Sequence, residues 1–71
     1  MVRRLYVVEL QDRHWYVRVG TLRHGPFLTR ANAVEAAIQA ASQRDSAEVL
    51  VRSPQGGLES VWVRPERTAD A

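Results

Sequence analysis

Residues 29–44 read TRANAVEAAIQAASQR, the only stretch of the chain with a sustained helical pattern. Its apolar residues recur at helical spacing, at Val34, Ala37, Ile38 and Ala41, and its polar residues cluster on the other side. Thr29 is the predicted N-cap, because its hydroxyl can accept a hydrogen bond from a free amide of the first turn. Leu28, just before it, is expected to pack against Ala33 as a hydrophobic staple.

This predicted helix is built mainly from alanine, and its only large apolar residues are Val34 and Ile38. Because alanine has the highest helix propensity, the segment needs little tertiary help to be helical. Small side chains also let a helix lie close to a sheet, so the sheet must supply the bulk of the core. The apolar arc is wider than one packing surface requires. Either alanine is simply tolerated on an exposed flank, or the helix has a second contact surface for another copy of the chain.

The segments before the helix predict an antiparallel hairpin. Residues 4–10 and 14–19 are rich in β-branched and aromatic side chains, and the second segment alternates between apolar and polar positions. A short polar turn at 11–13 joins them. Residues 20–26 break the pattern with Gly and Pro. Residues 27–28 are then either a very short further strand or the approach to the helix.

The segments after the helix predict a second hairpin. Residues 47–52 and 58–63 have strand character, and the loop at 53–57 contains strong turn formers. Both faces of the last strand carry apolar residues, because Trp62 alternates with Val61 and Val63. This pattern indicates a partner, or a loop that covers the strand.

The resulting order, β-β-(β)-α-β-β, predicts an α+β domain. We expect an antiparallel sheet of four to five strands with one helix packed on one face. The domain is expected to span residues 1–64, and the polar residues 65–71 are expected to form a frayed tail. Trp15 is predicted to be largely buried under the helix, in contact with Val34 or Ile38.

Composition narrows the possible functions. The 71 residues include no cysteine and only two histidines, so neither a disulfide nor a metal site is expected. A chain this short cannot easily enclose a ligand pocket and keep a core, so no cofactor or small-molecule ligand is expected. No signal peptide or membrane-spanning segment is recognisable, which predicts a cytoplasmic location and no membrane contact.

Several short motifs together resemble domain-of-unknown-function family 2188. They are an aromatic-Val-Val strand, a Trp-x-Val-basic strand, a Phe-x-Thr-basic entry into an Ala-rich helix, a Val-rich strand and a glycine turn, found at residues 6–8, 15–18, 27–37, 49–51 and 55–57. Asn32, where the family commonly has an acidic residue, and Tyr16, often a small residue there, depart from the pattern. The resemblance implies a small bacterial α+β protein with no assigned activity.

Catalysis is not expected. The available acid–base residues would be His14 on the polar face of the first hairpin, His24 in a loop, and a few carboxylates. An enzyme needs such groups positioned together in a cleft. We therefore predict a non-enzymatic domain.

Two functions remain open. Four arginines of the N-terminal half would form one phosphate-tracking surface for weak, sequence-independent nucleic-acid binding: Arg13, Arg18, Arg23 and Arg30. The preferred alternative is a homo-oligomerising or protein-interaction module, most simply a homodimer, that uses the wide helix arc or the last strand.

Overall fold

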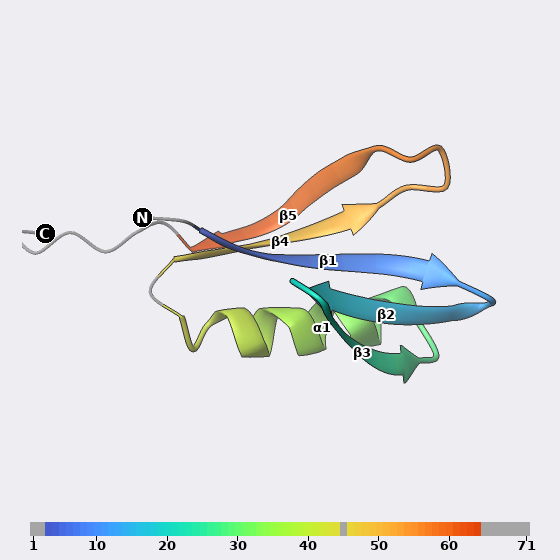
Figure 1. Ribbon diagram of the computed structural model, residues 1–71, viewed down its shortest axis with the longest axis horizontal. Coiled ribbons are helices and arrows are strands. Elements are labelled where there is room, and N and C mark those ends of the chain that lie inside the picture. Colours follow the sequence, from blue (N-terminus) through green and yellow to red (C-terminus); the bar gives the residue numbers. More distant parts are fainter. Residues whose placement is uncertain (1–2, 45, 65–71) are drawn as a thin grey trace, which may run out of the picture.

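The computed structural model describes residues 3–44 and 46–64 (Figure 1). Along the chain its elements are β1 (Arg4–Gln11), β2 (His14–Val19), β3 (Leu22–Phe27), α1 (Arg30–Ala41), β4 (Ala47–Arg52) and β5 (Leu58–Arg64). The predicted α+β class with five strands and one helix is confirmed. The predicted frayed tail, residues 65–71, lies outside the described residues.

The five strands form one open sheet in the order β3-β2-β1-β4-β5. Both hairpins are antiparallel, and β2 and β3 also pair antiparallel, but β1 and β4 run parallel. The prediction of a purely antiparallel sheet was therefore wrong. The helix lies between β3 and β4 in the chain, and it supplies the long connection that a parallel partner of β1 requires.

Both parallel strands contain a continuous apolar triplet, at residues 6–8 in β1 and 49–51 in β4. Their register places Tyr6 opposite Val49, and Val8 opposite Val51. In the sheet each of these strands has a neighbouring strand on both of its edges. Strand β5 contains a similar triplet at residues 61–63 but lies at the edge, so the triplets alone do not determine which strands are central.

The third strand is longer than the sequence predicted. It covers six residues, although Arg23, His24, Gly25 and Pro26 have low strand propensity in combination. Pairing with β2 overrides that preference, and a proline is tolerated because β3 lies at the edge of the sheet. Gly25 has φ +138°, and a Cβ atom there would lie 2.9 Å from the Trp15 carbonyl oxygen, so this position requires glycine.

The core lies between alternate strand residues and the helix. Its buried members are Tyr6, Val8, Val17, Ala33, Ala37, Ala41, Ala47, Val49 and Val51. The helix contacts β1, β2, β3 and β4, and its fully buried line consists of three alanines. The helix thus contributes small side chains to the core, and the strands contribute the larger groups. At twelve residues, α1 is too short to span a bilayer, and residues 3–44 and 46–64 contain no other helix.

The ends of the helix are held by side chains. The Thr29 hydroxyl accepts a hydrogen bond from the Asn32 amide at 3.1 Å, which confirms the predicted N-cap. Leu28 is 82% exposed, so the predicted hydrophobic staple was wrong. At the other end, the Arg64 guanidinium donates to the Ser42 carbonyl and ties β5 to the end of the helix.

Trp15 is less buried than the sequence predicted. It is only partly buried and packs against the edge of the core. Trp15 pairs with Leu10 near the β1–β2 turn, and in Figure 1 this end of the hairpin extends beyond the helix. The helix therefore does not cover the tryptophan fully, although the inward direction of its strand face was correctly assigned.

Candidate functional site

The strand residues that alternate with the core point to the other side of the sheet, which we call the second face. At its centre Val7 lies opposite Leu50, and both are partly buried. Leu5 and Val63 flank the same Glu48, and Leu58 lies opposite Arg52. We call these five apolar residues the apolar strip: Leu5, Val7, Leu50, Leu58 and Val63. Three of them, Leu5, Leu58 and Val63, are about half exposed, which is unusual for large side chains on one face of a small domain.

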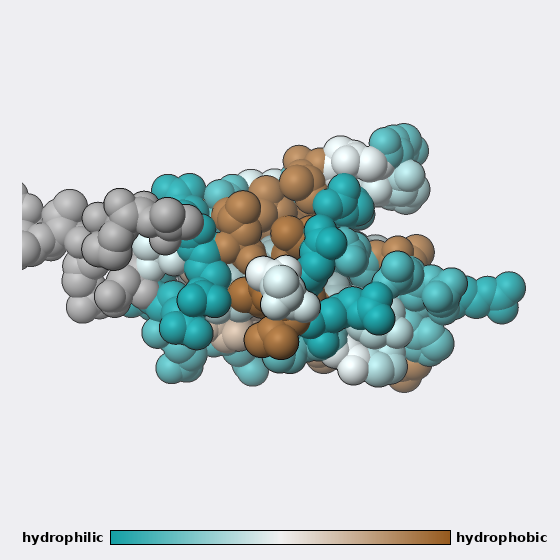
Figure 2. All heavy atoms as spheres, in the orientation of Figure 1, coloured by the Kyte–Doolittle hydropathy of each residue, from teal (hydrophilic) through white to brown (hydrophobic). Residues whose placement is uncertain are grey.

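Strand β5 adds apolar surface at the edge of the sheet. Its pairing with β4 contains an irregularity that leaves Val61 outside the ladder register, and Val61 is exposed. Trp62 pairs with Val49 and packs against the core, whereas its neighbour Val63 is 45% exposed on the second face. Hydrophobic residues are accordingly visible along the β5 side of the molecule, bordered by hydrophilic ones (Figure 2).

Charged groups of both signs lie beside the apolar strip. Glu9 lies 3.8 Å from Arg18 and 3.5 Å from Arg52, and Glu48 lies 3.2 Å from Arg3. The arginine side chains are about two-fifths exposed, so each pair contributes at most about 1 kcal/mol to stability. Together they give the second face a mixed charge pattern.

The neighbours of Glu48 perturb its ionisation. A hydrogen bond with the Ser60 side chain is the largest effect and lowers the pKa of Glu48; burial opposes it, and Arg3 lowers the pKa further. A carboxyl group whose pKa is lowered on folding stabilises the fold above its unfolded pKa. That stabilisation is lost as the pH falls through the folded pKa.

The substitution Glu48→Gln is therefore expected to destabilise the domain at neutral pH and to have no effect in strong acid. The difference in free energy of unfolding from the parent should shrink as the pH falls below the ordinary glutamate value of 4.5. Denaturant titrations at several pH values would measure it. Glu59→Gln on the neighbouring strand β5 is the matched control, and an equal pH dependence for both variants would contradict the assignment.

The structure brings together only two of the four predicted nucleic-acid-binding arginines. Arg18 and Arg23 are direct cross-strand partners on the second face. The Arg23 guanidinium lies 4.6 Å from the centre of the Tyr16 ring and donates to Gln11. Arg13 lies in the β1–β2 turn at φ +70°, and Arg30 is the first residue of the helix. The second face thus has a basic half on β2 and β3 and an apolar half on β1, β4 and β5.

The two histidines lie in unrelated places. The His14 ring is 3.1 Å from the Asp12 carbonyl oxygen in the first turn, and His24 projects from β3. Within residues 3–44 and 46–64, no three His, Cys, Asp or Glu side chains gather as metal ligands would.

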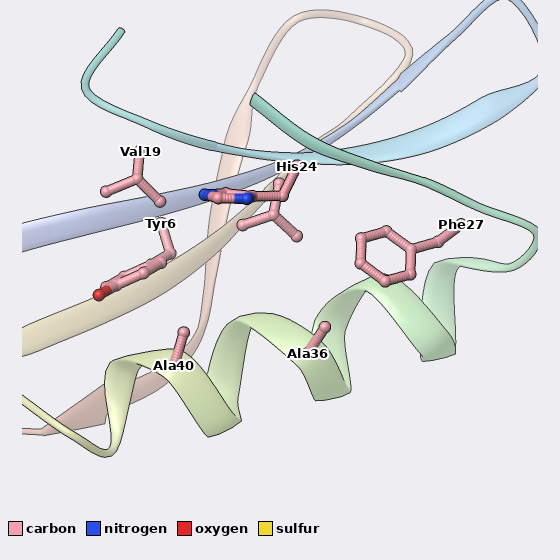
Figure 3. Close-up of a pocket in the computed structure, with 7 residues that line it drawn as sticks. Tyr6, Val19, His24, Phe27, Ala36 and Ala40 are labelled. Atoms are coloured by element: carbon pink, nitrogen blue, oxygen red, sulfur yellow. The ribbon is translucent and has the colours of Figure 1, made fainter. Parts of the chain in front are cut away.

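Sequence reasoning missed a groove between α1 and the β2–β3 hairpin. Its volume is about 250 Å³, and its walls are mainly carbon. Ala36 and Ala40 form its helical wall and Phe27 closes one end (Figure 3). The signal in the sequence was that both residues on this flank of the helix are alanines, whereas Val34 and Ile38 occupy the other flank.

The chain matches no protein-family model, no curated protein and no solved structure. The resemblance to domain-of-unknown-function family 2188 therefore stays a prediction.

Proposed function

We propose that the protein is a non-enzymatic module that forms a homodimer through the apolar strip of its second face. The observation that carries the proposal is the exposure of Leu5, Leu58 and Val63 around the partly buried pair Val7 and Leu50. Burying such side chains against a partner removes apolar surface from water, at about 25 cal/mol per Å². The proposal takes the helix as covering the opposite face only, which leaves the second face open to a partner.

The charges beside the strip favour a second copy as the partner. A two-fold interface brings the same patch of each copy together, so a patch of one charge sign would repel itself. This patch carries Glu9 and Glu48 together with Arg3 and Arg52. A rotated copy can therefore place acidic groups opposite basic ones, which favours a C2 homodimer over a partner of one strong charge.

Both edges of the sheet are protected against the addition of another strand, the β3 edge more than the β5 edge. The β3 edge contains Gly25 and Pro26, and proline removes a backbone donor, which protects an edge from strand addition. The irregularity near Val61 partly protects β5 as well. The proposed dimer therefore uses face-to-face packing beside β5 rather than simple extension of the sheet.

The experiment is the mass of the protein in solution across a range of concentrations, measured by sedimentation or light scattering. The mass is expected to rise toward twice the monomer value between about 5 and about 500 micromolar, together with the melting temperature. Val63→Lys should keep the protein monomeric at concentrations where the parent dimerises. Leu22→Lys is the matched control, because Leu22 is 63% exposed on the opposite edge strand.

A concentration-independent monomer would overturn the proposed dimer. Equal effects of Val63→Lys and Leu22→Lys would place the interface elsewhere. A dimer disrupted only by Leu22→Lys would assign it to the β3 edge.

Weak nucleic-acid binding is the second candidate, and the cross-strand pair Arg18 and Arg23 favours it. Two guanidinium groups side by side on a sheet face can contact adjacent phosphates, and Tyr16 beside them offers a stacking surface. Arg13 and Arg30 lie apart from this pair, so fewer phosphates are contacted than four clustered arginines would allow. Phosphate contacts carry no base information, so the binding is expected to be independent of sequence.

Titrating a short duplex at increasing salt tests this candidate. With two phosphates neutralised, the logarithm of the affinity should fall with a slope of about −1.8 against the logarithm of the salt concentration. Arg18→Gln with Arg23→Gln should remove most of that dependence, whereas Arg13→Gln with Arg30→Gln should leave it nearly unchanged. Binding that is absent at low salt, or that responds equally to both double variants, would rule out this surface.

A further inference from the structure

The helix–hairpin groove borders the core at Tyr6 and Val17 and lies outside the proposed dimer interface. Its lining residues come from four elements and are Tyr6, Val17, Val19, His24, Phe27, Ala36 and Ala40 (Figure 3). A second hollow shares Tyr6, Val19, His24 and Ala40 with it and continues toward the end of the helix. The two hollows thus form one trough, which is apolar at the Phe27 end and is lined at the other end by Arg4 and Arg44.

The groove exists because the helix residues that face the hairpin have small side chains. The fully buried line of the helix is Ala33, Ala37 and Ala41, which sets a close distance to the sheet. On the hairpin side of that line, Ala36 and Ala40 are too short to fill the space up to Val19 and Phe27. The resulting cavity stays open on the surface and is not closed by the fold.

Tyr6 provides a polar group in this apolar setting. The residue is only 4% exposed, and its hydroxyl makes no hydrogen bond with any residue in 3–44 or 46–64. In Figure 3 the hydroxyl points away from Phe27, along the trough. The described residues contain no buried side-chain polar atom that lacks a partner, so this hydroxyl reaches solvent in the trough and is accessible to a ligand.

The end of the trough away from Phe27 is basic. Arg4 and Arg44 both line it, and neither forms an ion pair with a residue of the described ranges. An apolar trough that ends in a tyrosine hydroxyl and two guanidinium groups is complementary to a molecule with an apolar body and one anionic end. Arginine is well suited to that end, because its planar donors match the two oxygens of a carboxylate.

We propose that the helix–hairpin groove binds a small amphiphilic monocarboxylate. The apolar body lies between Ala36, Ala40 and Phe27, and the carboxylate accepts hydrogen bonds from the Tyr6 hydroxyl and from Arg4 and Arg44. The volume of the groove limits the ligand to a short chain or a single ring, below the size of most drug-like ligands. Because the groove lies on the helix side of the sheet, binding does not depend on the dimer.

Octanoate is a suitable probe, followed by methyl NMR of the parent protein. Saturable shifts are expected at Val19, Ala36 and Ala40. Octanol and octyltrimethylammonium, which replace the anionic head with a neutral and a cationic one, should bind at least about tenfold more weakly.

Tyr6→Phe should weaken octanoate binding by about 3- to 10-fold, because it removes one hydrogen bond and keeps the ring. Arg44→Gln should also weaken octanoate binding, and it should make the affinity less dependent on the salt concentration.

A groove-filling substitution provides the sharpest comparison. Ala40→Leu should abolish the shifts, because the larger side chain occupies the space while its exposed position preserves the fold. Ala31→Leu, also exposed on the helix but outside the groove, should bind octanoate like the parent. Unchanged binding by Ala40→Leu, equal binding of all three probes, or shifts centred on exposed residues such as Leu28 would each overturn the proposal.

Discussion

Replacing Val8 by aspartate is expected to leave the chain largely unfolded at room temperature. Val8 is 0% exposed at the centre of β1, where its neighbours are the apolar residues of the core. An uncompensated buried charge costs roughly 3–5 kcal/mol, with the lost apolar burial in addition. A domain of this length has a total stability of only about 4–10 kcal/mol, so one such charge removes most of it.

The matched control is Leu5→Asp, three residues earlier on the same strand. Leu5 is 48% exposed on the second face, so the charge there stays hydrated and the fold should survive. Circular dichroism and denaturant unfolding of both variants, at concentrations where the parent is monomeric, would measure the difference. If Val8→Asp folds as well as Leu5→Asp, the alternation that separates the core from the second face is misassigned.

Replacing Ala37 by leucine is expected to lower the free energy of unfolding by about 1–3 kcal/mol. Ala37 is 1% exposed at the middle of the helical line that lies against the sheet. A leucine there has no space to occupy, so the helix must move away from β1 and β4 or adopt strained side-chain conformations. The effect is large because the whole core was built around a close approach of the helix.

Ala31→Leu is the control for this second prediction. Ala31 is exposed in the first turn of the same helix, and leucine is nearly as good a helix former as alanine. Its cost should stay within about 0.5 kcal/mol. Thermal or denaturant unfolding of the two variants would give the comparison. A tolerated Ala37→Leu would mean that the gap between helix and sheet is wider than the buried alanines indicate.

The sequence predicted the elements better than it predicted their arrangement. The helix and its Thr29 cap were recognisable because propensity, spacing and capping chemistry are all local properties. The hairpins were recognisable from the turn residues that separate alternating segments. The parallel pairing of β1 with β4 was not predicted, because it joins residues more than forty positions apart and depends on which strands compete for the centre.

One sequence signal narrows the candidates for that pairing. Residues 6–8 and 49–51 are apolar triplets that lack alternation, and the structure pairs them with each other, but residues 61–63 form a third such triplet on the edge strand β5. Strand β3 gave no comparable signal, since its residues have low strand propensity and are held in place by β2. Trp15 was assigned to the correct face, but the reach of the helix along the sheet could not be predicted from its length alone.

The spatial arrangement of the arginines could not be predicted from the sequence either. Counting them along the chain suggested one basic surface, yet only Arg18 and Arg23 lie side by side. The apolar strip and the groove were not identified as units, because each depends on the register between strands or on the angle of the helix. The sequence offered two candidate partner surfaces, the wide apolar arc of the helix and the last strand with apolar residues on both faces.

Intermolecular NOEs would show whether two copies meet through the second face. A concentrated mixture of isotope-labelled and unlabelled protein, in an isotope-filtered experiment, reports only contacts between different copies. The account predicts such contacts from the methyl groups of the apolar strip: Leu5, Val7, Leu50, Leu58 and Val63. Contacts confined to Leu22, Ala36 or Ala40, or no contact between copies at all, would contradict it.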